Sequence, residues 1–188
     1  TISLPQGWYI FSTYIQAENP SMDQLLAPVF NSLIIAKDGE GLAYIPNFDF
    51  NGIGDLNFKE GYQIKTNTAD NLEICGLQMH PEDHHIDLLA GWNLISYLRE
   101  TPAQVDVVVE GLTSNDNLVI VKDFNGNPYL PEWDFNGIGD MHPGQGYQLK
   151  VNNADTLYYL SNNEEYRISN TQVIENKVDH FAKVIPTG

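Results

Sequence analysis

Positively charged residues are scarce in this sequence of 188 residues. It contains 9 Lys and Arg against 25 Asp and Glu, so the formal net charge at pH 7 is −16 and the protein is acidic. Proteins bind nucleic acid through clusters of Lys and Arg, whereas here the basic residues stand singly along the chain. The composition therefore argues against nucleic acid as a partner.

Cysteine and long hydrophobic runs are also nearly absent. Cys75 is the single cysteine, so the chain cannot form an internal disulfide, and cysteine usage indicates no redox compartment. No run approaches the roughly 18 apolar residues that cross a bilayer, so we expect no membrane insertion. Thr1 to Gly7 lack the basic and apolar regions of a secretory signal. We expect a soluble chain that is mature, excised or cytosolic.

The sequence repeats itself once. Gly7-Trp8 aligns with Gly91-Trp92 at an offset of 84 residues, and the 40 residues from Leu33 to Leu72 align with Leu118 to Leu157 at an offset of 85 with 22 identities. Self-similarity at a fixed period is typical of tandem structural units. The chain therefore consists of two related copies of one module.

The repeat defines the expected domains. We predict one β module in residues 1–77 and a second in residues 78–161, with residues 78–85 as a linker. Residues 162–188 form a C-terminal segment with strand-like apolar patterns. This segment either adds an edge strand to the second module or begins a further domain.

Local patterns within each copy predict mainly strands. Four apolar residues in succession, Leu33–Ala36 and Leu118–Val121, indicate central strands that are buried on both faces. Ser21-Met22-Asp23-Gln24 and Thr101-Pro102-Ala103-Gln104 match a capping box, which predicts the start of a short helix. We therefore expect a mainly β protein with a minor α content, built from two tandem modules of about six short strands and one short helix each.

Several motifs carry a resemblance to a known group of proteins. Gly-Trp-Asn-Leu-Ile-Ser at 91–96, Phe-Asn-Gly-Ile-Gly-Asp at 135–140 and Gly-Tyr-Gln at 146–148 resemble repeat modules of large secreted or cell-surface proteins of Bacteroidota, of the type IX secretion kind. In such proteins these modules accompany adhesive or polymer-handling domains. The resemblance implies an extracellular or cell-surface setting for a modular protein, and it implies no ligand.

The duplicated loop Asp-Phe-Asn-Gly-Ile-Gly-Asp is the most site-like motif. Acidic and Asn oxygens at alternate positions around a glycine turn are what a calcium loop uses, so Ca²⁺ is the cofactor to consider. The Ile at the fifth position and the absence of flanking helices favour the other interpretation, in which the side chains cap backbone amides of a tight turn. The candidate metal ligands are Asp49, Asn51, Asp55 and Glu60 in the first copy and Asp134, Asn136 and Asp140 in the second.

Catalytic motifs are missing from the sequence. It has no Gly-x-Ser-x-Gly elbow, no phosphate-binding glycine loop and no metalloprotease helix, so we predict that the protein is not an enzyme. Cys75 aligns with Leu160 and is expected to be a small buried hydrophobic residue. His80, His84 and His85 are interpreted as part of the solvated linker.

Aromatic residues are the remaining candidates for binding. The strand pattern places Trp8 and Trp92 in the core. Trp133 and its counterpart Phe48 lie between a proline and the glycine loop, where a ring either covers the core or serves as a platform for a sugar. Tyr129, Tyr158 and Tyr159 extend such a surface in the second copy. Trp133, Tyr129, Tyr158 and Phe48 are therefore the candidate ligand-binding residues.

Together these observations predict a non-catalytic role outside the cell. The expected function is adhesion or the binding of an extracellular polymer, with a polysaccharide or a surface protein as partner. The alternative is a passive spacer that sets the distance between functional domains. A binding module should expose an aromatic cluster, whereas a spacer should bury its aromatic rings in both copies alike.

Overall fold

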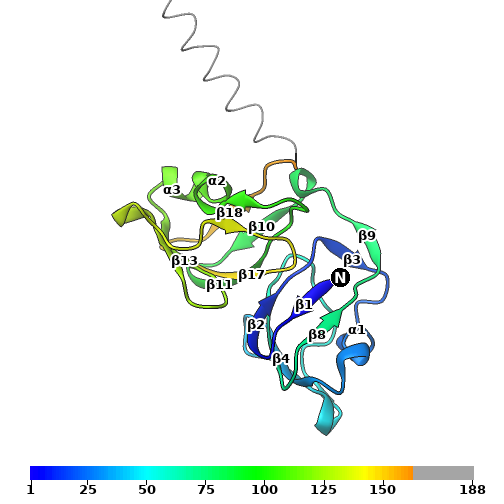
Figure 1. The fold of residues 1–188 in the computed structure, drawn as a ribbon. Coiled ribbons are helices and arrows are strands. Elements are labelled where there is room, and N and C mark those ends of the chain that lie inside the picture. The colour runs from blue at the N-terminus through cyan, green and yellow to red at the C-terminus, as the bar shows by residue number, and fades with distance from the viewer. Residues whose placement is uncertain (163–188) are drawn as a thin grey trace, which may run out of the picture.

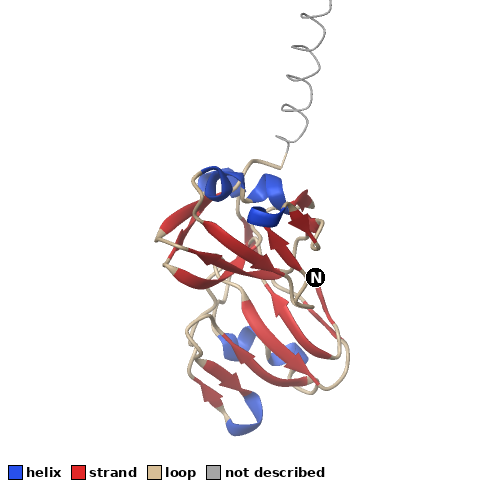
Figure 2. Cartoon of the chain, turned by 90° about the vertical axis from the view of Figure 1, so that its left-hand side faces the viewer, coloured by secondary structure: helices blue, strands red, loops and turns tan. Residues whose placement is uncertain are grey.

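A computed structural model describes residues 1–162 and shows a mainly β protein with a few short helices (Figures 1 and 2). The strands of the first copy are β1 (Ile2–Leu4), β2 (Gly7–Phe11), β3 (Ile15–Ala17), β4 (Leu33–Lys37), β5 (Ala43–Ile45), β6 (Phe50–Asn51), β7 (Tyr62–Thr66), β8 (Asp70–Leu72) and β9 (Gly76–Gln78). Those of the second are β10 (His85–Leu88), β11 (Gly91–Ser96), β12 (Ala103–Gln104), β13 (Leu118–Lys122), β14 (Pro128–Leu130), β15 (Phe135–Asn136), β16 (Asp140–Met141), β17 (Gly146–Val151) and β18 (Asp155–Tyr158). The described part of each copy thus has more strands than the expected six, because short pairings at turns add strands of two or three residues.

Each helix is about one turn long, with three to five residues. They are α1 (Met22–Leu25), η1 (Ala27–Val29), η2 (Pro46–Phe48), η3 (Pro81–Asp83), α2 (Val105–Val108), α3 (Glu110–Ser114) and η4 (Pro131–Trp133), where η marks a 3-10 helix. The predicted capping boxes are wrong, because neither helix start has a side-chain cap. Backbone carbonyls replace them: the amide of Met22 donates to Gly54 at 2.9 Å, and that of Val105 donates to Gly139 at 3.0 Å.

Each copy builds the same antiparallel five-stranded sheet. The strand orders are β2-β7-β4-β5-β6 and β11-β17-β13-β14-β15, so β4 and β13 are central, as their apolar sequences predict. Their predicted burial on both faces is wrong, since Ile34 is exposed and Ile120 is half-buried. The register shifts near the start of both strands, and only one face of the sheet packs on a core.

The core lies on the face opposite to the one predicted. Tyr9 and Phe11 of β2 are buried in the core of the first copy, whereas Trp8 between Gly7 and Tyr9 points outward and is 47% exposed. Trp92 of the second copy is 52% exposed in the same position. The prediction that these two Trp residues are core is therefore wrong. A period of two shows which residues share a face, and it does not show which face meets the core.

The two copies interlock at equivalent positions. The amide of Ser12, at the end of β2, donates to the carbonyl of Gly144 at 3.1 Å, and the amide of Ser96, at the end of β11, donates to the carbonyl of Lys59 at 3.2 Å. Gly144 and Lys59 occupy the same place in the two copies. The Ser12 hydroxyl also donates to the Gln145 carbonyl at 2.6 Å and accepts the amide of Tyr97 at 3.1 Å. The end of β2 thus bonds to the loop before β17, and the end of β11 bonds to the loop before β7.

The predicted linker is partly strand, and the C-terminal segment is outside the described residues. Gln78 pairs with Ile15 of β3, and His85 is the first residue of β10 and pairs with Tyr158. Both ends of the predicted linker 78–85 are therefore in strands, and the interpretation of His85 as part of a solvated linker is wrong. Residues 163–188 lie outside the described residues, and with them the strand-like patterns expected at the C-terminus. Within residues 1–162, no helix has the length and apolar content needed to span a membrane.

Candidate functional site

The four predicted ligand-binding residues do not form one cluster. Trp133 and Phe48 are 75% and 81% exposed, so they are available for binding. Tyr129 is buried in the core of the second copy, which leaves its ring no surface to offer. Tyr158 is exposed on β18, in a separate two-stranded sheet, with its ring 5.7 Å from that of His85. Tyr159 is buried, and its hydroxyl donates to the carbonyl of Ser96.

Backbone geometry explains why Trp133 and Phe48 project into solvent. Each is the last residue of a 3-10 helix that begins at a proline and ends at an aspartate in the left-handed region, with φ of 48° at Asp134 and 50° at Asp49. This change of direction leaves the aromatic ring at the tip of the turn. Phe135 and Phe50 follow on short strands and are half exposed. Each copy therefore has a turn that exposes two aromatic rings, and we call this turn the aromatic tip of the copy.

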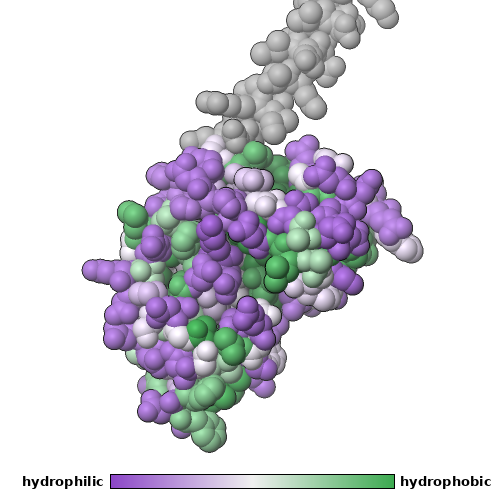
Figure 3. All heavy atoms as spheres, turned by 180° about the vertical axis from the view of Figure 1, so that it is seen from behind, coloured by the Kyte–Doolittle hydropathy of each residue, from purple (hydrophilic) through white to green (hydrophobic). Residues whose placement is uncertain are grey.

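The two aromatic tips lie at separate ends of the molecule. In Figure 1 the tip of the first copy is the cyan segment at the lower end, and that of the second is the olive segment at the left. In the view from behind, the lower end is coloured as apolar (Figure 3). Rings that single soluble domains usually bury are thus presented on the surface at two places.

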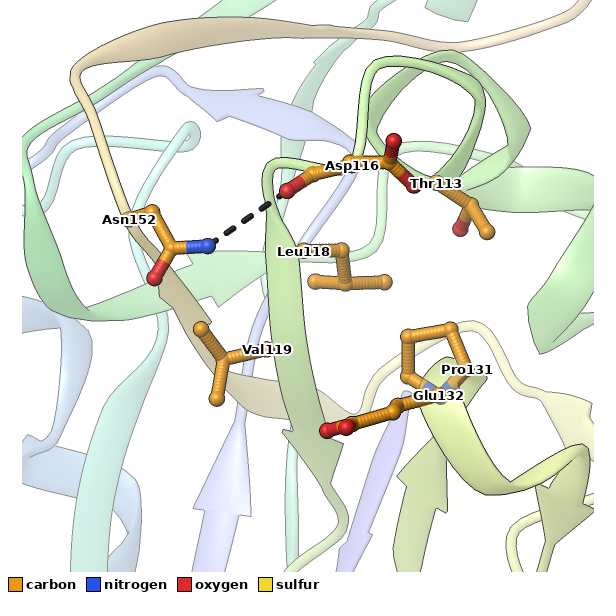
Figure 4. A pocket seen from close by; sticks show the side chains of 7 residues that line it. All are labelled: Thr113, Asp116, Leu118, Val119, Pro131, Glu132 and Asn152. Atoms are coloured by element: carbon orange, nitrogen blue, oxygen red, sulfur yellow. Dashed lines mark hydrogen bonds between the residues drawn. The ribbon is translucent and has the colours of Figure 1, made fainter.

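A pocket of about 420 Å³ adjoins the tip of the second copy (Figure 4). Pro131 and Glu132, which precede Trp133 in η4, form one side, and Asp116 and Asn152 form the other. The amide group of Asn152 donates to the backbone carbonyl of Asp116 at 3.4 Å. The pocket thus contains the side chains of two acidic residues and one amide, which are groups that bind the hydroxyls of a polar ligand. Trp133 does not line the pocket, and it follows the lining residue Glu132 in the chain.

The duplicated glycine loops close on themselves. Asn51 accepts the amide of Gly54 at 2.8 Å, and Asn136 accepts the amides of Ile138 and Gly139 at 3.1 and 2.8 Å. The Gly54 and Gly139 carbonyls then receive the first amides of α1 and α2. The two Asn side chains therefore cap backbone amides and position the helices, as the turn interpretation predicts.

The other candidate calcium ligands point to different partners. Glu60 accepts the side-chain amide of Asn57 at 2.8 Å, and Asp140 accepts that of Gln104. Asp49 and Asp134 occupy the left-handed positions that end the 3-10 helices. In residues 1–162, no three His, Cys, Asp or Glu side chains gather to hold a metal ion. Calcium binding by these loops stays a prediction.

Sequence reasoning missed a second pair of exposed aromatic residues. Lys37 and Lys65 lie over the ring of Trp8, and Lys122 and Lys150 lie over that of Trp92. The alignment of the copies contained a signal, because both lysine positions are identical in the two copies. Assignment of the two Trp residues to the core concealed it.

The pKa shifts reflect structural hydrogen bonds and burial. A hydrogen bond from Ser32 lowers the pKa of Asp70, and one from Asn117 lowers the pKa of Asp155, which is the equivalent residue of the second copy. Burial raises the pKa of Tyr9 to about 12, although its hydrogen bond to Gln145 of the other copy acts in the opposite direction. The causes of these pKa shifts are hydrogen bonds and burial within the fold.

Cys75 differs from its expected environment. It is exposed rather than buried, so the prediction of a small hydrophobic core residue is wrong. Its counterpart Leu160 is partly buried. Cys75 precedes β9, which pairs with the short strand β3 at the surface, and the ends of such strands are accessible to solvent.

Comparison with known families, curated proteins and solved structures found no match. The resemblance to repeat modules of Bacteroidota surface proteins therefore stays a prediction that depends on the motifs alone.

Proposed function

We propose that the protein is a non-catalytic binding module that holds an extracellular polysaccharide on the aromatic tip of its second copy. The observation that carries the proposal is the exposure of Trp133, which is three-quarters in solvent at the end of η4. Trp133 directly follows Glu132, which lines a pocket together with Asp116 and Asn152. An indole ring offers a flat apolar face to the C–H groups of a sugar ring, and the neighbouring polar groups accept or donate hydrogen bonds to its hydroxyls.

The exposure of aromatic rings favours binding over a purely structural role. Burial of an aromatic side chain removes 150–250 Å² from water and is worth several kcal/mol, about 25 cal/mol per Å². The tips leave Trp133 and Phe48 mostly exposed and Phe135 and Phe50 half exposed, so they forgo a large part of this energy. A ligand that covers these rings would remove their apolar surface from water, which would favour binding.

A passive spacer is the second candidate. The reciprocal hydrogen bonds of Ser12 and Ser96 across the copies favour it, because they join two small modules into one rigid unit of defined length. In this function the aromatic tips bind no polymer, and they contact neighbouring domains of a longer chain.

Affinity electrophoresis against a panel of neutral polysaccharides separates the two functions. We expect one polymer to retard the protein and the Trp133→Ala variant to lose this retardation. Phe48→Ala is the matched control, since it removes the equivalent ring of the first copy and leaves the pocket beside Glu132 intact. Each run is made with calcium and with a chelator.

Three outcomes decide the matter. Loss of retardation in Trp133→Ala alone supports the proposal. Retardation that survives Trp133→Ala and disappears with the chelator moves the site to the glycine loops. Absence of retardation by every polymer favours the spacer.

A further inference from the structure

The outer faces of the two sheets carry the same arrangement of one indole ring and two ammonium groups. The Nζ atoms of Lys65 and Lys37 lie 5.5 and 5.9 Å from the centroid of the Trp8 ring. Those of Lys122 and Lys150 lie 5.3 and 5.9 Å from that of Trp92. Lys65 and Lys150 are the direct cross-strand partners of the two Trp residues, so the sheet register holds each arrangement in place.

These lysines account for most of the positive charge in the described chain. Residues 1–162 contain six Lys and Arg, and four of them surround the two indole rings. An ion pair in this part of the chain joins His85 and Asp87 at 3.6 Å, whereas none of the four lysines has a described carboxylate within 4.0 Å. In a protein with a net charge of −16, opposite charges are abundant, so their absence around these ammonium groups leaves the groups open to a ligand.

A pocket adjoins each of the two rings. The pocket of about 360 Å³ beside Trp8 is closed by the β13–β14 turn of the second copy, including Asn125 and Phe124. The pocket of about 270 Å³ beside Trp92 is closed by the β4–β5 turn of the first copy, including Gly39 and Glu40. The interlocked copies therefore create both pockets, and each pocket contains residues from both copies.

We infer that these are two related sites for a sugar unit that bears a carboxylate. The sugar ring would lie against the exposed part of the indole, and its carboxylate would accept hydrogen bonds from the two ammonium groups. The amide of Gln63, which also lines the Trp8 pocket, is available for a hydroxyl group. The sites are separate from the Trp133 tip, so the inference does not depend on the proposed function.

The two pockets differ in charge, which predicts a difference in affinity. Asp123 is the acidic residue of the Trp8 pocket, and its carboxylate already accepts the amides of Asn125 and Asn127 within its own turn. Glu40, Glu60 and Asp87 line the Trp92 pocket together with Lys59. The larger number of carboxylates repels an anion, so we expect tighter binding at Trp8.

The three Trp residues allow each site to be observed separately. The chain has only Trp8, Trp92 and Trp133, so a ¹⁵N–¹H spectrum contains three indole signals, which single Trp→Phe variants assign. Titration with a trimer of galacturonic acid should shift the signals of Trp8 and Trp92. A neutral glucose trimer should leave both unchanged, and a shift of Trp133 by that trimer reports on the tip alone.

The duplication supplies an internal control for the charge. In the double variant Lys37→Met and Lys65→Met, the stems that cover the ring remain while both ammonium groups are lost. We expect the affinity at Trp8 to fall at least tenfold while the titration of Trp92 in the same molecule is unchanged, which also shows that the fold is intact. In the double variant Lys37→Arg and Lys65→Arg, the affinity at Trp8 should be within a few-fold of that of the unmodified protein.

The inference is overturned if the acidic trimer leaves the Trp8 and Trp92 signals in place, or if the Trp8 shift survives in the Met double variant. If acetate at the same carboxylate concentration shifts the Trp8 and Trp92 signals equally, the claim that the sites recognise a sugar ring is overturned. If the neutral trimer does not shift the Trp133 signal, the result counts against the proposed function, and the inference about the sites at Trp8 and Trp92 is unaffected.

Discussion

Gly61 and Gly146, which are equivalent residues of the two copies, meet at the contact between them. A Cβ atom placed on Gly146 would stand 3.2 Å from the Cα atom of Gly61, 3.1 Å from the Phe11 carbonyl and 2.7 Å from Cγ2 of Ile10. One on Gly61 would stand 2.7 Å from the Ile95 carbonyl oxygen. The backbones of the copies therefore approach so closely that only glycine fits at these positions.

Addition of a methyl group at this contact should weaken the whole protein. We expect Gly61→Ala and Gly146→Ala each to lower the free energy of unfolding by about 1–3 kcal/mol, because backbone atoms cannot move aside as a flexible side chain would. Urea unfolding measures the effect. Gly111→Ala in α3 is the control, since a Cβ there meets no atom within 4 Å, and we expect it to be neutral or stabilising. Unchanged midpoints for both interface variants would show that the copies do not interlock in solution.

The side chain of Asn136 should stabilise the glycine loop of the second copy. Asn136→Ala removes the acceptor for the amides of Ile138 and Gly139, and we expect a loss of about 1–2 kcal/mol that is the same in calcium and in chelator. Thermal unfolding in both buffers checks this, with the exposed Asn153→Ala as control. If calcium raises the melting temperature of the unmodified protein and Asn136→Ala abolishes the rise, the loop is a calcium site instead.

Acid should destabilise the protein in part through Asp70 and Asp155. Hydrogen bonds from Ser32 and Asn117 hold the pKa of these carboxylates below the ordinary value of 3.8. Their contribution to stability is therefore complete above the pKa of the unfolded chain and is lost as the pH falls through the lower pKa of the folded state. The urea midpoint should fall below about pH 4, and it should fall less in the Asp70→Asn and Asp155→Asn double variant.

Cys75 should react as an exposed thiol. In native buffer we expect an aromatic disulfide reagent to modify one thiol per chain without denaturant, because Cys75 is accessible at the surface. Cys75→Ser should change the free energy of unfolding by less than about 0.5 kcal/mol, as is usual for a surface substitution. A thiol that reacts only after unfolding would instead support the buried position that its alignment with Leu160 suggested.

Much of the fold could be predicted from local patterns. The alternation in Ile2–Leu4, the Asn-Gly turn at 125–126 and the apolar runs at Leu33 and Leu118 correspond to strands and hairpins of the structure. The short strands at the loops could not be predicted, because pairs such as β12 and β16 depend on a partner about 37 residues away in sequence. The capping boxes were misleading because the helix amides bond to loop carbonyls instead.

The candidate sites could be predicted only in part. Exposure of Trp133 and Phe48 shows that these rings do not cover the core, and their role as a sugar platform stays a prediction. Burial of Tyr129 and exposure of Trp8 were not evident, because both depend on which face of the sheet meets the helices.

The sequence by itself determined that this protein contains one β module twice, since 22 identities over 40 aligned residues specify the same strands, turns and loops in both copies. Tertiary structure alone decided which sheet face is buried and how the copies join. The physical reason is that strand periodicity is local, whereas burial depends on what packs against each face. The contact between Gly61 and Gly146, and the pockets beside Trp8 and Trp92, exist only because the second copy closes over the first.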